Sequence, residues 1–173
     1  MVRGTLKFIK ILALALVCVL TPKLCYAATA AILPLINSTM DREAGAVYLR
    51  EAARAVELKP GFTLVKDDRV YKAACQYVSP SRLPNAYELE QIARAAGIDV
   101  IISMQLSKME KTGGGFNFAG TACGYNALSR RSYRRVLKGE SPKPGSLASR
   151  WEWRHAAWGK AVRQEAARVL AGR

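Results

Sequence analysis

Apolar residues in the first part of the chain fall into short runs separated by segments with helical spacing. Residues 28–37 and 62–65 are short apolar runs closed by polar or turn-forming residues, a pattern typical of buried strands. Pro34 must then lie at an edge or an irregularity, because it has no N–H to donate to a neighbouring strand. Residues 41–56 carry apolar side chains at intervals of three and four, which predicts an amphipathic helix. Its expected inward residues are Tyr48, Leu49, Ala52, Ala53 and Val56.

Two further helices are predicted in the middle of the chain by their end signals. Asp67 or Asp68 can accept hydrogen bonds from the free amides of a short helix that would end at residue 77. Asn85 begins a second helix and is followed by Glu88 three residues later, the spacing of a capping box. Gly97 can end that helix in a left-handed conformation.

Three consecutive strands are predicted after the helices. Residues 98–106 are rich in β-branched side chains and too apolar for an exposed strand. Three glycines at 113–115 favour a turn, and residues 116–128 and 133–138 predict two more strands. These three segments would form an antiparallel meander.

A last helix closes the predicted domain. A polar linker over residues 140–149 precedes a helical pattern over residues 150–170. The elements together predict an α/β (α+β) fold, with a single mixed sheet of about five strands, helices packed on it and a C-terminal helix. The expected apolar stripe of the last helix consists of Trp151, Trp158, Val162, Ala166 and Val169.

The amino-terminal segment has the layout of a secretory signal peptide. A basic start is followed by an apolar run at residues 8–20 and by small residues that allow cleavage after Ala27 or Ala30. The apolar run is shorter than the about 20 residues that a helix needs to cross a bilayer. We therefore expect residues 1–27 to be removed and residues 28–173 to form one exported domain, in the periplasm or another extracytoplasmic space, without a membrane span.

The mature domain is expected to be strongly basic. Four of the 27 basic residues and none of the 13 acidic ones lie in residues 1–27, so the cleaved chain would carry a net charge of +10. Such a charge favours anionic partners such as phospholipid head groups, wall polymers or acidic proteins. Export argues against nucleic acid. Solubility alone is an equally good explanation of the charge.

The densest basic group lies around the last predicted hairpin. On a hairpin these residues would form a positive edge that can bind phosphates or carboxylates. The alternative is a charged edge that prevents strand-to-strand aggregation. Trp153, which points away from the apolar stripe, is a further candidate contact residue. The hairpin residues are Arg130, Arg131, Tyr133, Arg134, Arg135 and Lys138.

The cysteines that remain after cleavage leave two alternatives open. Cys75 and Cys123 could form a disulfide in an oxidising compartment, or they could be two buried free thiols.

Catalytic, metal-binding and cofactor-binding patterns are missing from the sequence. His155 is the only histidine and has no ligand-spaced Cys, Asp or Glu near it in the sequence, so we interpret it as an ordinary helix residue. Gly115 and Gly120 have the spacing of a phosphate loop, but Thr121 stands where that motif needs lysine, which favours a hairpin turn. We therefore expect a non-enzymatic protein without metal or cofactor.

The order of elements and several segments resemble a known family. The segments ILPLIN, FTLV, ELEQIARAAGIDVIISMQLSKME and GYNALSRRSYRRVLKGE resemble the periplasmic domain shared by the curli-secretion lipoprotein and the N-terminal domain of the Tol-system propeller protein. The resemblance implies a non-catalytic envelope protein that acts in secretion, assembly or docking. The chain lacks the lipid-anchored cysteine, the membrane-spanning hairpins and the propeller of those proteins, so pore formation and Tol partners are not implied.

These observations give two functional hypotheses. The first is an exported docking or assembly module for an envelope protein or assembly. The second is a binder of anionic lipid, wall polymer or another polyanion through the basic hairpin.

Overall fold

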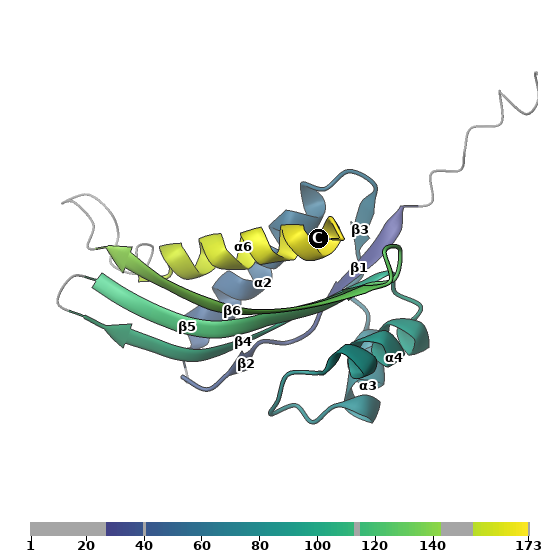
Figure 1. Cartoon of the computed structure of the whole chain (residues 1–173), viewed down its shortest axis with the longest axis horizontal. Helices are drawn as coiled ribbons and strands as arrows, with labels where there is room; N and C mark the ends of the chain where they lie inside the picture. The colour runs from purple at the N-terminus through teal and green to yellow at the C-terminus, as the bar shows by residue number, and fades with distance from the viewer. Residues whose placement is uncertain (1–26, 40, 113–114, 143–153, 173) are drawn as a thin grey trace, which may run out of the picture.

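A computed structural model describes residues 27–39, 41–112, 115–142 and 154–172. These residues form one mixed α/β layer structure built on a single six-stranded sheet (Figure 1). No helix within these segments has both the length and the apolar character needed to cross a membrane. The described strands are β1 (Ala28–Ile32), β2 (Ile36–Asn37), β3 (Phe62–Leu64), β4 (Val100–Lys111), β5 (Gly115–Asn126) and β6 (Arg131–Pro142). The helices are α2 (Arg42–Glu57), α3 (Asp68–Tyr77), α4 (Ala86–Ala96) and α6 (Ala156–Leu170).

The sheet joins a parallel part to an antiparallel meander. Its strand order is β3-β1-β4-β5-β6, and β2 pairs with β4 beside this path. The strands β3, β1 and β4 are parallel, whereas β4, β5 and β6 form long antiparallel pairs. The mixed sheet and the three-strand meander confirm the fold class expected from the sequence.

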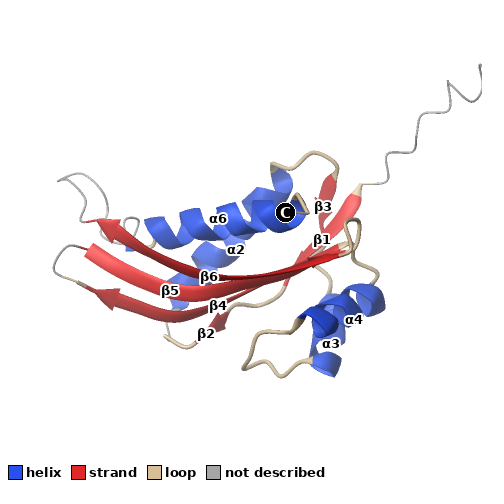
Figure 2. Ribbon diagram, viewed as in Figure 1, coloured by secondary structure: helices blue, strands red, loops and turns tan. Residues whose placement is uncertain are grey.

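Helices cover the sheet from both sides. Figure 2 shows α2 and α6 on one face and α3 and α4 on the other. One core lies between the sheet and the first helix pair, and its largest fully buried side chains include Tyr48 and Trp158. A second core lies under α3 and α4 and includes Ile101. Alternate residues of β4 enter opposite cores because successive side chains of a strand point to opposite faces.

The helix caps form as the sequence predicts. The Asp67 side chain accepts from the Arg69 amide at the start of α3. Asn85 and Glu88 form both halves of the capping box of α4, and Gly97 ends that helix with a φ of 64°. Capping depends only on neighbours in the sequence, so it can be predicted without the tertiary structure.

Two details differ from expectation. The apolar run at residues 28–37 is two strands, because Pro34 lies in the break between β1 and β2. Leu49 was expected inside but is 50% exposed. Its side chain instead borders an open pocket that Ile32 and Leu64 also line. Trp151 of the expected final stripe lies outside the described residues.

The meander extends past the second helix pair. In Figure 1, α3 and α4 lie under one end of the sheet, and the half that carries the β4–β5 turn has no described helix beneath it. On that face the paired positions Thr121 and Val136, and Ala119 and Lys138, belong to β5 and β6. This open half of the sheet ends at β6, which is an edge strand.

Candidate functional site

The predicted basic residues lie on and beside edge strand β6, but they do not form one patch. Lys138 pairs in register with Ala119 on the open half of the sheet, and Arg134 pairs on the same face with Cys123, which lies in the core under α3 and α4. Tyr133 and Arg135 pair with Gly124 and Ala122, whose side of the sheet carries α6. The alternation of the strand therefore divides the basic group between two faces.

The residues on the α6 side are already engaged with that helix. Arg135 lies 3.7 Å from Glu165, which also binds Arg168 at 2.6 Å. Burial raises the pKa of Glu165, and the charge of Arg135 opposes that rise. Arg135 is thus a structural contact of α6 as well as a surface cation.

The remaining basic residues are available for a partner. Arg131, Arg134 and Lys138 are exposed and form no ion pair with any residue that the structure describes. Arg130 is in the β5–β6 turn with a φ of 52°. Trp153 lies outside the described residues, so its role stays a prediction.

An apolar side chain lies between two of these cations. Val136 is 65% exposed, and the alternation of β6 places it on the open face between Arg134 and Lys138. Because β6 pairs only with β5, the backbone groups of its other side are left for water or another strand. This combination of edge backbone, cations and an exposed apolar residue is the β6 edge site.

The two cysteines are separate free thiols. Cys75 is exposed on α3, whereas Cys123 is buried in β5. Burial raises the pKa of Cys123 to about 11, although a hydrogen bond with Ser103 and the charge of Arg134 oppose the rise. The structure therefore contains neither the disulfide nor the pair of two buried thiols.

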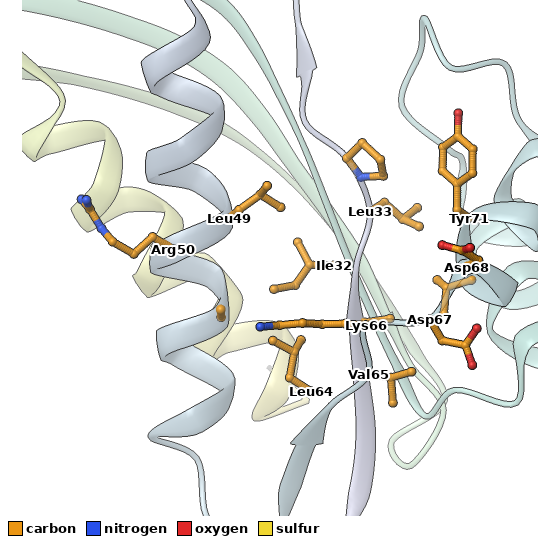
Figure 3. Close-up of a pocket in the computed structure, with 14 residues that line it drawn as sticks. Ile32, Leu33, Leu49, Arg50, Leu64, Val65, Lys66, Asp67, Asp68 and Tyr71 are labelled. Carbon is orange, nitrogen blue, oxygen red and sulfur yellow. The ribbon is translucent and has the colours of Figure 1, made fainter.

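A pocket of about 590 Å³ opens at the carboxyl ends of β1 and β3 (Figure 3). After β1 the chain passes through β2 to α2 on one face, and after β3 it enters α3 on the other face, so the pocket lies where the connections of adjacent strands diverge. Open α/β sheets bind ligands at this kind of position.

The lining of this pocket selects no single class of ligand. In Figure 3, Lys66 extends toward α2, while Asp67 and Asp68 lie on the α3 side. Arg50 points away from the pocket. Opposite charges therefore lie around a largely apolar floor, which includes Ile32.

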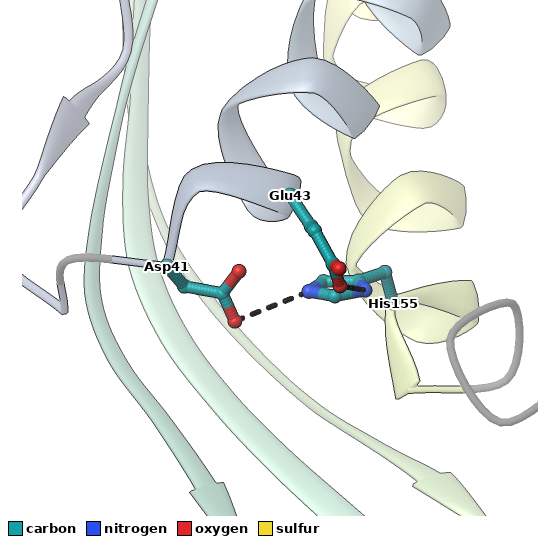
Figure 4. Close-up of side chains that lie close together, drawn as sticks. All are labelled: Asp41, Glu43 and His155. Atoms are coloured by element: carbon teal, nitrogen blue, oxygen red, sulfur yellow. Dashed lines mark hydrogen bonds and ion pairs between the residues drawn. The ribbon is translucent and has the colours of Figure 1, made fainter.

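A charged cluster that sequence reasoning missed joins the starts of α2 and α6 (Figure 4). His155 is 2% exposed, and its Nε2 lies 3.2 Å from Oδ2 of Asp41. Its Nδ1 lies 3.9 Å from Oε2 of Glu43. Arg154 binds the same Asp41 oxygen at 2.9 Å. No local pattern in the sequence could reveal this cluster, because His155 and Asp41 are 114 residues apart.

Asp41, Glu43 and His155 lie close enough to hold a metal ion. The geometry nevertheless favours a structural role, in which the contacts of Asp41 with His155 and Arg154 hold the start of α2 against α6; we call these contacts the clasp. Asp41 already uses Oδ1 to accept from the Ala44 amide and Oδ2 to bind Arg154 and His155. Burial raises the pKa of Asp41, but these hydrogen bonds and the charges of His155 and Arg154 outweigh it and hold the pKa below its usual value. A metal ion would have to displace a guanidinium.

Comparison with solved structures supports the fold. The chain is similar to the hypothetical protein CT253 from Chlamydia trachomatis, with a TM-score of 0.57 and 12% identity over 84% of this chain and 99% of that one. At this identity the likeness shows the fold alone.

Two weaker likenesses are to a bacterial lipoprotein and to a domain of LpoB. Lipoprotein GNA1162 from Neisseria meningitidis gives a TM-score of 0.46 at 14% identity, covering 80% of this chain and 96% of that one. The C-terminal domain of LpoB from Salmonella enterica gives 0.41 at 14% identity, covering 66% and 84%. Neither supports a conclusion about function, and the narrower resemblance to the curli-secretion and Tol families stays a prediction.

No family model and no curated protein matches the sequence.

Proposed function

We propose that this protein is an exported, non-catalytic docking module of the bacterial cell envelope that binds an acidic, extended segment of another protein along the β6 edge site. Binding by strand addition uses the free backbone groups of an edge strand for affinity and its side chains for specificity. Residues 28–173 would form this module after removal of the signal peptide.

One observation carries the proposal: β6 is an edge strand of 12 residues whose open face presents Val136 between two cations without an acidic partner. A strand that carries carboxylates could pair with Arg134 and Lys138 while its backbone bonds to β6. The exposed apolar residue favours a protein over a uniformly charged polymer.

The same charges disfavour association of two copies through this edge. Two β6 strands paired with each other would bring cationic side chains of both copies close together, and like charges opposite one another are destabilising. The cations are explained equally well if their role is only to prevent aggregation through the edge strand. In that case the protein needs no partner at this edge. The proposal and this alternative therefore differ in whether anything binds.

Site-specific photocrosslinking in cells distinguishes them. A photoreactive residue at position 136 should form an adduct with a defined protein, whereas the same residue at Tyr87, which is 68% exposed on α4, should not. Replacing Arg134→Glu and Lys138→Glu should remove the adduct, and Lys72→Glu on α3 should leave it. Equal adducts at both positions, or none, would contradict the proposal.

The alternative function is binding of an anionic lipid or wall polymer through the same cations. It predicts retention on anionic vesicles or polymer that disappears as salt is raised, because exposed charges are screened. That result without a protein adduct at position 136 would favour the alternative.

A further inference from the structure

A cationic groove runs along the outer side of the helix pair α2–α6. Its volume is about 400 Å³, and it is lined by residues of both helices. Four of the lining side chains are basic and one is acidic; these are Arg50, Arg54, Lys160, Arg163 and Glu51. The groove shares none of its residues with the β6 edge site.

The single carboxylate organises two of the cations without neutralising the groove. The Glu51 side chain is only 8% exposed and accepts from Nε and Nη2 of Arg163 at 2.8 and 2.7 Å. Nε of Arg50 lies 3.2 Å from its other oxygen. Glu51 thus holds both guanidiniums at the groove wall, and at most one of the four positive charges is balanced.

The other two cations have no acidic partner. Arg54 and Lys160 are exposed and form no ion pair with the part of the chain that the structure describes. Like charges confined to one concave surface repel each other and raise the local concentration of anions. An anion in the groove would reduce that repulsion.

Close packing of the two helices brings the cations together. A Cβ added at Gly159 would lie 3.2 Å from Cγ1 of Val47 and 3.3 Å from Cγ of Glu51. Both distances are shorter than ordinary side-chain contacts, so α6 packs closely against α2 because Gly159 has no side chain. The His155 clasp with Asp41 joins the same two helices at the adjacent end of the groove.

We propose that this groove binds a phosphate group, either on a soluble phosphate compound or on a phospholipid head group. Guanidinium groups form paired, charge-assisted hydrogen bonds with phosphate oxygens, and an ammonium adds a point charge. The polar walls and the surplus of positive charge match an anion. They disfavour a metal ion or an apolar ligand.

Titration of the mature chain with inorganic pyrophosphate tests the soluble form of the ligand. The double variant Arg54→Gln/Lys160→Gln should weaken binding by about tenfold for each removed cation. The matched control Arg134→Gln/Lys138→Gln removes the same charge from β6 and should bind like the parent. Circular dichroism checks that both variants fold, which we expect because the four side chains are exposed and unpaired.

Vesicles distinguish the two sources of phosphate. Binding to phosphatidylglycerol vesicles but not to phosphatidylcholine vesicles, lost in the groove variant and kept in the β6 variant, assigns the groove to a lipid head group. Groove-dependent binding of pyrophosphate alone assigns it to a soluble compound. If neither probe binds, or if the groove variant binds as well as the control, the inference is wrong. The docking proposal is unaffected by that outcome, because it depends on other residues.

Discussion

Thr29 and Asp99 join the first strand of the domain to the start of β4. Both the amide and the hydroxyl of Thr29 donate to Oδ2 of Asp99, at 2.8 and 2.9 Å. The Asp99 amide in turn donates to the carbonyl and hydroxyl oxygens of Thr29, both at 3.1 Å. In the same strand, Ala28 and Ala30 pair in register with β3.

The amino terminus of the exported chain follows from this pairing. We predict cleavage after Ala27, because cleavage after Ala30 would remove Thr29 and more than half of β1. Intact mass measurement of the exported protein should give a chain that begins at Ala28. In urea unfolding, a chain that begins at Ala31 should be clearly less stable than one that begins at Ala28. Equal stability would contradict the role of this link.

The clasp between α2 and α6 predicts a pH-dependent contribution to stability. Asp41→Asn keeps a side chain that can cap α2 but removes the charge that binds Arg154 and His155. We expect a loss of roughly 1–2 kcal/mol in the free energy of unfolding near neutral pH.

The sign of the pH effect follows from the lowered pKa of Asp41. A carboxyl whose pKa is lower in the folded state stabilises the fold at pH values above its ordinary pKa of 3.8. This contribution is lost as the pH falls through the pKa that the carboxyl has in the folded state. The difference in the free energy of unfolding between parent and variant should therefore shrink as the pH falls below 3.8. Asp67→Asn is the control, since that exposed cap should change stability little.

The buried hydroxyl of Tyr48 should contribute measurably to the free energy of unfolding. It donates to the carbonyl of Leu33 at 2.9 Å, in the loop between β1 and β2. Burial raises the pKa of Tyr48, so the hydroxyl stays protonated and remains a donor. Tyr48→Phe should lower the free energy of unfolding by about 1–3 kcal/mol, because the carbonyl loses its buried partner. Tyr87→Phe on the surface of α4 should have no measurable effect, and equal losses would refute the explanation.

The two cysteines should differ in reactivity. Iodoacetamide at about pH 8 should modify Cys75 in the native protein and leave Cys123 unmodified, because thiolates are the reactive form and burial raises the pKa of Cys123 to about 11. Unfolding in denaturant without reductant should expose a second reactive thiol. Mass spectrometry that finds no modification in either state would instead indicate a disulfide.

Much of the fold was predictable because its signals are local. The capping box at Asn85 and Glu88 and the left-handed Gly97 involve residues only a few positions apart. The stripe of Trp158, Val162, Ala166 and Val169 is buried as its helical spacing predicts. The burial of Leu49 was predicted wrongly, because helical spacing alone does not show that this side chain borders an open pocket.

The candidate sites were much less predictable. The sequence shows that basic residues gather near β6, but only the pairing register shows that Arg134 and Arg135 face opposite sides. The groove between α2 and α6 combines residues about one hundred positions apart, so no local pattern could reveal it.

The sequence by itself determined most of the elements, their order and the caps at Asp67, Asn85 and Gly97, because hydrophobic period and end signals act over a few residues. The tertiary structure alone decided that His155 meets Asp41, that Arg163 meets Glu51, and that half of the meander stays open on one face. These relationships arise from the way the helices pack across the sheet, and that packing depends on the shape and burial of side chains far apart in the chain.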